Sequence, residues 1–264
     1  MRELKRISYS FLHTFACPYA AFLRYEAAIK LKVTDSLALG NALHLALELS
    51  HKQSEWKLDY AVTEFQKEFK RIIEEDDVFI SWPKMKKMEA EGIEMLSLYY
   101  TGLLSGQISK TPTAVEEEFE LPFENEIVVV GKIDKREDEE DGEYTITDYK
   151  SGKYEPDAWF LRHDLQFTTY AWAGYEKKGK LPRKLRWHHL RTGKILETER
   201  TMEDVEELKT MMHNALEMNR NSIRYRVYHS QVCKWCDFKG AVCDDRELEK
   251  SLVKQREALK VTEA

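Results

Sequence analysis

The sequence predicts an α/β fold, because two kinds of periodicity alternate along its 264 residues. A β-hairpin is predicted over residues 128–153, where alternating side chains flank the acidic turn DEEDG. Helices are predicted before and after this hairpin, since apolar residues recur there every three or four positions. Strands set among amphipathic helices are typical of a sheet that is covered by helical layers.

The chain begins with two helical segments. Residues 7–25 are predicted to be helical with an interruption at Pro18, which cannot continue a helix from the preceding turn. Residues 36–50 are predicted to form an amphipathic helix. His44 lies on this helix four residues after Gly40, a residue that allows close approach to a sheet. Taken alone, a histidine on an apolar helix is interpreted as a structural core residue.

A helical insertion and the first strand follow. Residues 57–108 are predicted to be helical throughout, with Pro83 in the first turn of a second helix. Residues 114–123 alternate apolar and acidic side chains and are predicted to be a strand. Glu116 or Glu118 could reach a metal as an outer ligand, but an exposed acidic face is the favoured interpretation.

The hairpin carries the strongest chemical signal. Its arms are predicted at residues 126–136 and 143–150. Asp148 and Lys150 are two positions apart and therefore share one face of the strand. Asp134 joins that face in any register that pairs even positions with even positions. Carboxylates bind Mg²⁺ or Mn²⁺ and a lysine stabilises developing negative charge, so this face suits phosphodiester hydrolysis.

Three elements are predicted after the hairpin. Residues 156–179 are predicted to form one helix, with Gln166 and Tyr170 on the same face. Residues 184–191 are predicted to be a strand that turns back on itself. The basic residues of that strand indicate either phosphate contacts or an edge strand guarded by charge. Residues 201–219 are predicted to be a further helix.

Four cysteines occur, and their spacing indicates a metal site. They are Cys17, Cys233, Cys236 and Cys243. Cys233 and Cys236 form a knuckle that offers two thiolates to one metal, which favours metal binding over disulfides in a cytoplasmic protein. Structural zinc more often uses two such knuckles, but zinc remains an alternative here.

The composition narrows the class of protein. Charged residues make up 33% and hydrophobic residues 42%, which is globular composition with a heavily charged surface. The net charge of −6 does not by itself indicate a nucleic-acid-binding domain, although a local basic strip can serve an acidic protein. No apolar run reaches the length of a membrane span and no secretory signal is evident, so a cytoplasmic location without a membrane partner is expected. The charged tail, residues 244–264, is expected to be helical.

The order of these motifs resembles the PD-(D/E)XK nuclease superfamily, and most closely its RecB-like branch. The matching positions are Cys17, Gly40 with His44, Gly131 with Asp134, Asp148 with Lys150, Gln166 with Tyr170, and the cluster Cys233, Cys236 and Cys243. The resemblance spans nearly the whole chain. It implies a single nuclease domain over residues 1–264, with a mixed central sheet flanked by helices and an insertion at about residues 55–110.

The resemblance also implies roles for these residues. His44, Asp134, Asp148 and the backbone carbonyl of Tyr149 would bind one or two Mg²⁺ or Mn²⁺ ions. Lys150 would orient the attacking water or stabilise developing charge, while Gln166 and Tyr170 would hold the DNA strand near the metal. The four cysteines would hold a [4Fe–4S] cluster, with structural Zn²⁺ as the alternative.

The expected activity is metal-dependent exonuclease cleavage of DNA, in recombination, repair or phage DNA processing. The expected substrate is single-stranded DNA or DNA with free ends. The alternative is a non-catalytic or partner-dependent DNA-binding subunit, which would work with a recombination helicase–nuclease or with CRISPR adaptation proteins.

Overall fold

The chain divides into two compact units. The computed structural model describes residues 4–29, 31–76, 78–221, 225–227, 231–234, 236–240, 242–244, 247, 250 and 251. The first unit comprises Met1–Leu31, Glu120–Val130 and Glu206–Ala264, and the second comprises Lys32–Phe119 and Gly131–Val205. The single domain expected from the sequence stays a prediction.

A mixed sheet forms the centre of the second unit. Strand β3 (Val128–Asp138), which enters this unit at its fourth residue, is antiparallel to β4 (Tyr144–Lys150). Strand β4 is parallel to β5 (Lys184–His189), which is antiparallel to β6 (Lys194–Thr198). Strand β2 (Ala114–Pro122) also pairs with β3. The prediction of a mixed central sheet is therefore confirmed.

The register of the hairpin sets the face of its side chains. Lys135 pairs with Thr147 and Arg136 pairs with Ile146, so even positions face even positions across β3 and β4. The assumed register is therefore confirmed, because residues that pair across an antiparallel ladder project to the same side of the sheet.

Strand β5 is not an edge strand, contrary to one interpretation of its basic residues. Within the described part of the chain it lies between β4 and β6. Its cations are neutralised across the ladder, since Arg186 Nε donates to Glu197 Oε1 over 2.9 Å and Lys184 pairs with the same carboxylate. The basic residues of β5 therefore do not protect an unpaired sheet edge.

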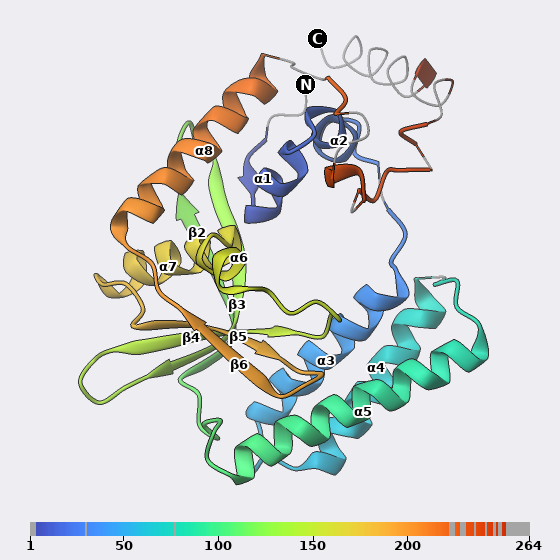
Figure 1. Cartoon of the computed structure of the whole chain (residues 1–264), viewed down its shortest axis with the longest axis vertical. Coiled ribbons are helices and arrows are strands. Elements are labelled where there is room, and N and C mark those ends of the chain that lie inside the picture. The colour runs from blue at the N-terminus through green and yellow to red at the C-terminus, as the bar shows by residue number, and fades with distance from the viewer. Residues whose placement is uncertain are drawn as a thin grey trace. The chain divides into compact units, whose positions relative to one another are not determined.

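Three helices cover one side of this sheet. They are α3 (Asp35–His51), α4 (Leu58–Glu75) and α5 (Trp82–Leu104), which lie side by side in Figure 1. Their buried faces share one apolar core with Tyr149 of β4 and with Leu190, which follows β5. The segment predicted to be helical throughout residues 57–108 consists of the two helices α4 and α5, which end at Glu75 and Leu104. Its status as an insertion stays a prediction. Removing this apolar surface from water is what binds the helical layer to the sheet.

The helix expected over residues 156–179 is two helices instead. Helix α6 (Ala158–Arg162) and helix α7 (Leu165–Lys178) are separated at Asp164. The Asp164 backbone is extended, and its side chain accepts a hydrogen bond from the backbone of Phe167. Aspartate favours this N-cap role over a helix interior, because its short side chain competes for backbone donors.

The first unit is built from short elements. Strand β1 (Arg6–Ile7) runs parallel to the start of β3. Helix α1 (Tyr9–Phe15) is followed by α2 (Pro18–Ala21) and a π-helical turn, Phe22–Glu26. The break between α1 and α2 falls at Cys17, as the proline predicted. A 3₁₀ turn, Gln231–Lys234, lies near the other end of the chain.

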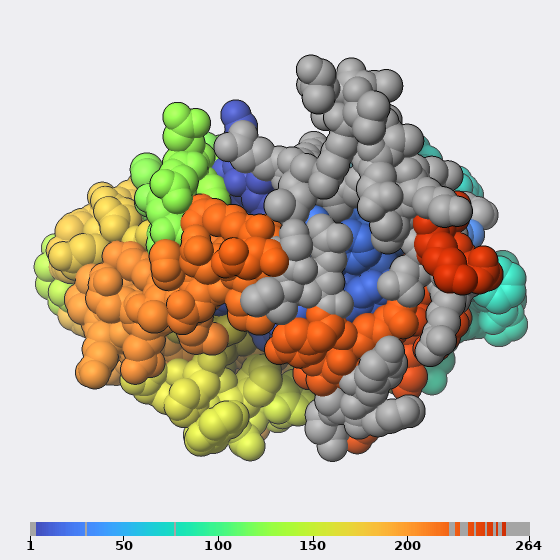
Figure 2. All heavy atoms as spheres, turned by 90° about the horizontal axis from the view of Figure 1, so that it is seen from above, coloured from blue at the N-terminus to red at the C-terminus, as the bar shows by residue number. Residues whose placement is uncertain are grey.

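Helix α8 (Met202–Arg220) begins in the second unit and continues into the first. Thr201 and Asp204 cap its start, because the Asp204 backbone donates to Thr201 Oγ1 and the Thr201 backbone donates to Asp204 Oδ2. Its exposed outer face is orange in Figure 2. The predicted helix in the tail, residues 244–264, lies largely outside the described residues. Every helix among the described residues is too short or too polar to span a membrane.

Candidate active site

A compact group of potential metal ligands lies in the second unit. Among the described residues, His44, Glu116 and Asp134 offer ligand atoms that all lie within 4.8 Å of one another. His44 Nδ1 is 3.5 Å from Glu116 Oε1 and 3.4 Å from Asp134 Oδ1. One nitrogen and two carboxylates from three separate elements therefore converge on one position.

Glycine lets helix α3 bring its histidine close to the end of β4. A Cβ atom at Gly40 would lie 3.2 Å from Ser151 Oγ, which is tighter than ordinary contact. One turn later, His44 Nε2 lies 3.1 Å from the carbonyl oxygen of Tyr149. The interpretation of His44 as a core residue does not explain these contacts, because its ring reaches both the carboxylates and the strand backbone.

Glu116 reaches the site through an unusual backbone conformation. Its φ is +48°, in the left-handed region that strands normally avoid. The side chain is turned inward and is only 7% exposed, while Lys132 Nζ lies 2.7 Å from its second carboxylate oxygen. The exposed-face interpretation of this strand is wrong for Glu116, whereas Glu118 is exposed as expected. Alternation alone carries no signal for such a local backbone conformation.

Tyr149 contributes its main chain on one side and its ring on the other. Its backbone nitrogen donates to Asp134 Oδ2 over 2.7 Å, which orients that carboxylate. Its hydroxyl lies 2.9 Å from the hydroxyl of Tyr99, and Tyr99 in turn lies 2.7 Å from His51 Nε2. The expected carbonyl ligand of Tyr149 is thus held beside His44 by a buried chain of polar contacts.

A closed ring of contacts joins the predicted catalytic residues. Lys150 Nζ lies 2.6 Å from Asp148 Oδ2 and donates to Gln166 Oε1 over 2.7 Å. Gln166 Nε2 donates to the Tyr170 hydroxyl over 2.8 Å, and that hydroxyl donates to Asp148 Oδ1 over 3.3 Å. The ammonium also lies 5.1 Å from the centre of the Trp187 ring. Asp148 therefore contacts Lys150 and Tyr170, and it is Glu116 that completes the tightest group of ligands.

The local charges shift the acidity of these groups. Burial raises the pKa of Asp148 to about 6, even though the charge of Lys150 opposes that shift. Burial lowers the pKa of His44, but the charges of Asp134 and its neighbours outweigh burial and raise it well above its usual value. Burial also acts to raise the pKa of Asp134, but the His44 charge brings it below its usual value. The carboxylates around His44 therefore favour a positive charge at its ring.

The donor set fits a hard divalent cation. Carboxylate and carbonyl oxygens suit Mg²⁺ and Mn²⁺, and one imidazole is compatible with Mn²⁺ in particular. His44, Glu116 and Asp134 would hold such an ion, with the Tyr149 carbonyl and Asp148 adjacent.

The four cysteines lie in the first unit. Cys17, Cys233, Cys236 and Cys243 are free thiols, and all four line one cavity of about 320 Å³. Their sulfurs form no group of three within 4.8 Å among the described residues. Burial raises the pKa of the Cys243 thiol, and the neighbouring Cys236 and Cys17 add to that shift. The chain ends therefore bring the cysteines to one cavity without a disulfide.

Comparison with known proteins identifies a family. Residues 6–244 match the PD-(D/E)XK nuclease superfamily, and the mixed sheet flanked by helices is consistent with its core. No curated protein matches the chain. Among solved structures, one titled "Crystal structure of SSO0001" is similar at 15% identity, over 90% of this chain and 85% of that chain, with a TM-score of 0.42.

Proposed function

Because the chain belongs to the PD-(D/E)XK nuclease superfamily, we propose that it is a metal-dependent deoxyribonuclease that acts as an exonuclease. The observation that carries the proposal is the convergence of His44, Glu116 and Asp134 beside the Asp148–Lys150 pair. Buried carboxylates are costly to desolvate. Their grouping around the Lys150 ammonium therefore favours a catalytic use over a purely structural one.

The ligand set proposed here differs from the sequence expectation by one residue. His44, Asp134 and the Tyr149 carbonyl remain, and Glu116 joins them, while Asp148 borders the same position. A bound Mg²⁺ or Mn²⁺ would supply Lewis-acid activation of the scissile phosphate and of the attacking water. The left-handed backbone at Glu116 supports its role as a ligand, because strained conformations are concentrated at functional sites.

The remaining residues act on the substrate and on Lys150. The Lys150 ammonium, oriented by Asp148 and Gln166, stabilises the negative charge that develops on the phosphate. Tyr170 orients Gln166 and Asp148 through its hydroxyl. In this scheme Gln166 and Tyr170 hold the reacting groups in place, with the DNA strand passing over them.

The biological setting rests on the motif order alone. The sequence of motifs from Cys17 to Cys243 supports assignment to the RecB-like branch, and with it a role in recombination, repair or phage DNA processing in the cytoplasm. DNA with free ends or single-stranded DNA is the proposed substrate.

The cysteines are proposed to hold a [4Fe–4S] cluster. The fit is that all four thiols line one cavity in the first unit. A single zinc ion binds thiolates at ~2.3 Å, which would place the sulfurs roughly 3.8 Å apart. The preference for a cluster over zinc comes from the cysteine spacing in the sequence, one distant Cys17 with the group Cys233, Cys236 and Cys243. Anaerobic purification tests the choice, because a brown, iron-containing protein supports the cluster and a colourless, zinc-containing protein rejects it.

The nuclease proposal is tested by cleavage of end-labelled DNA with Mg²⁺ or Mn²⁺. The wild type is compared with Asp148→Ala and Lys150→Ala, and EDTA serves as the metal-free control. Glu140→Ala, which changes an exposed acid in the turn of the same hairpin, is the matched control. Metal-dependent cleavage that both site variants lose supports the proposal, and release of the terminal label first indicates exonuclease action. Absence of cleavage by the folded, metal-loaded wild type would reject it.

A further inference from the structure

A short segment beside the active site exposes two large aromatic side chains. Residues 151–165 connect β4 to α7 and include helix α6. Tyr154 is 56% exposed and Trp159 is 70% exposed. Both ends of the segment are joined at the catalytic lysine, because Lys150 precedes it and Gln166, which accepts the Lys150 hydrogen bond, follows it. The exposed rings therefore belong to a loop that starts and ends at the site.

Aromatic contacts lead from the surface of this segment back to Lys150. The Tyr154 ring meets Phe160 edge-on at 5.5 Å between centroids. Phe160 meets Trp187 edge-on at 6.3 Å, and the Trp187 ring lies 5.1 Å from Lys150 Nζ. A chain of ring contacts, through the partly buried Phe160 and the buried Trp187, thus links the exposed Tyr154 ring to the predicted catalytic amine.

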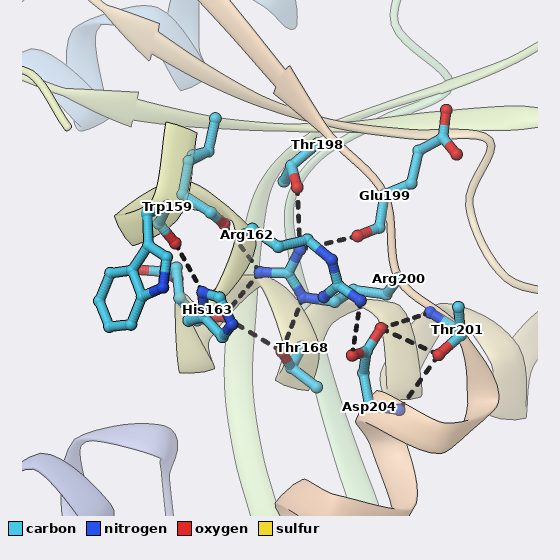
Figure 3. A network of polar contacts seen from close by, with 11 residues as sticks. Trp159, Arg162, His163, Thr168, Thr198, Glu199, Arg200, Thr201 and Asp204 are labelled. Atoms are coloured by element: carbon cyan, nitrogen blue, oxygen red, sulfur yellow. Dashed lines mark hydrogen bonds and ion pairs between the residues drawn. The ribbon is translucent and has the colours of Figure 1, made fainter. Parts of the chain in front are cut away.

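The segment is held in a fixed position by a buried arginine (Figure 3). Arg200 is 5% exposed and donates to the carbonyl oxygens of Leu161 and Asp164, each over 3.0 Å. It also donates to Thr168 Oγ1 over 2.8 Å, which joins α6 to α7. Leu161 lies two residues after Trp159, so these bonds fix the end of the helix that carries the indole.

The Trp159 ring is mostly exposed to solvent and is covered in part by His163. The His163 ring lies 4.5 Å from it between centroids, and His163 Nδ1 lies 2.7 Å from the Trp159 carbonyl oxygen. A rigid aromatic side chain that keeps most of its surface in water loses little conformational entropy when it binds a second flat ring.

The charge of the segment argues for base contacts over phosphate contacts. Residues 151–165 carry three carboxylates, Glu155, Asp157 and Asp164, against the two cations Lys153 and Arg162. Arg162 is engaged by Asp204 at 2.9 Å. This segment therefore offers no excess positive charge to a phosphate backbone. Its exposed aromatic rings can stack on unpaired bases of any sequence, because every base has a π-face.

We propose that Tyr154 and Trp159, on the segment that joins Lys150 to Gln166, form a stacking platform for the bases of single-stranded DNA. This inference rests on the proposed nuclease function and specifies its substrate as a single strand. In a duplex the faces of the bases are already stacked on one another, so the platform contributes little there.

The test measures binding of one fluorescently labelled oligonucleotide, as a single strand and as a blunt duplex, by fluorescence anisotropy of the full-length protein in EDTA. Trp159→Ala is expected to weaken single-strand binding roughly tenfold, which corresponds to the loss of one stacked base. Duplex binding is expected to change less than about twofold. Trp159→Phe, which keeps a stacking ring, is expected to retain most of the affinity.

Trp82→Ala is the matched control, because Trp82 is also a tryptophan of the second unit and is 68% exposed, on helix α5. Unchanged single-strand affinity in Trp159→Ala, or equal losses for single strand and duplex, would overturn the stacking platform. The metal-dependent cleavage assay separates the two proposals. A wild type that cleaves DNA without any dependence on Trp159 keeps the nuclease and loses the platform. A wild type that binds single strands through Trp159 but never cleaves keeps the platform and loses the nuclease.

Discussion

The carboxylate site and the cysteine cavity are both proposed here as metal sites, but they are built in different ways. In the second unit the ligands converge from a sheet and a long helix, and three of them already lie within 4.8 Å. In the first unit the thiols come from the N-cap of a short helix, a 3₁₀ turn and loops, and they line a cavity of about 320 Å³. The carboxylate group is therefore compact, whereas the cysteines are spread around a cavity.

This difference predicts that the two sites depend on a bound metal in different ways. A sheet register and the hydrogen bond from Tyr149 to Asp134 orient the carboxylates before any ion binds. Short helices and turns have few main-chain hydrogen bonds of their own, so the cysteine segments need cross-links from a bound metal. We therefore expect metal loss to switch off the carboxylate site without unfolding it, and to destabilise the cysteine unit.

The largest expected effect is on catalysis in the second unit. Lys150→Ala should lower the cleavage rate by at least about 100-fold, because a charge that stabilises the transition state is lost. The thermal unfolding midpoint should fall by only a few degrees, because Asp148, whose pKa is about 6, can take up a proton when the neighbouring ammonium is lost. Rates on end-labelled DNA and circular dichroism melts measure the two properties. A variant that melts far below the wild type would show that this site is not independent of the fold.

The next effect is on stability and belongs to the first unit. Cys236→Ser should abolish metal retention and lower the thermal midpoint by roughly ten degrees or more, because metal-binding free energy is folding free energy in such sites. Metal analysis of the purified protein and melts with and without chelator provide the measurement. Equal melting of the variant and the wild type would contradict a structural metal there.

A smaller effect is expected at the strained glutamate. Glu116→Gln should weaken Mn²⁺ binding roughly 10- to 100-fold, since a charged ligand becomes neutral at unchanged shape. Isothermal titration of the metal-free protein measures the affinity. Glu118→Gln is the matched control, because that side chain lies on the same strand and is exposed. Similar affinities for both variants would remove Glu116 from the ligand set.

The smallest effect concerns acid stability of the core behind the site. Burial lowers the pKa of His188 to about 3, and the charge of Lys135 adds to the shift. An unfolded histidine titrates near ~6.5, so between that pH and about 3 the unfolded state binds a proton that the folded state does not. The free energy of unfolding should therefore fall as the pH falls, by up to about 1.4 kcal/mol per pH unit for this group.

His188→Gln should make the pH dependence of the unfolding free energy shallower, because one fewer proton is taken up on unfolding. Urea unfolding between about pH 6.5 and 4 measures this slope. If His188→Gln keeps the wild-type slope, His188 is not the group that takes up the proton on unfolding.

The local patterns were sufficient for much of the second unit. Period-two alternation and the acidic turn predicted the hairpin, and the spacing of Asp148 and Lys150 placed them on one face. Helical spacing predicted α3 and the pairing of Gln166 with Tyr170. These features follow from neighbouring residues, because backbone geometry repeats over a few positions and needs no distant partner.

Tertiary structure alone decided which additional residues reach the site. Glu116 points inward only because the strand bends locally into a left-handed conformation beside Lys132. Helix α6 ends at Arg162 and Asp164 caps the start of α7, while Arg200 donates to the Leu161 carbonyl beside this break. Such choices depend on hydrogen bonds between residues that are distant in sequence, and a periodic pattern of hydrophobicity does not encode them. Local sequence patterns therefore predicted most of the elements and the motif face, while long-range packing brought the candidate ligands together.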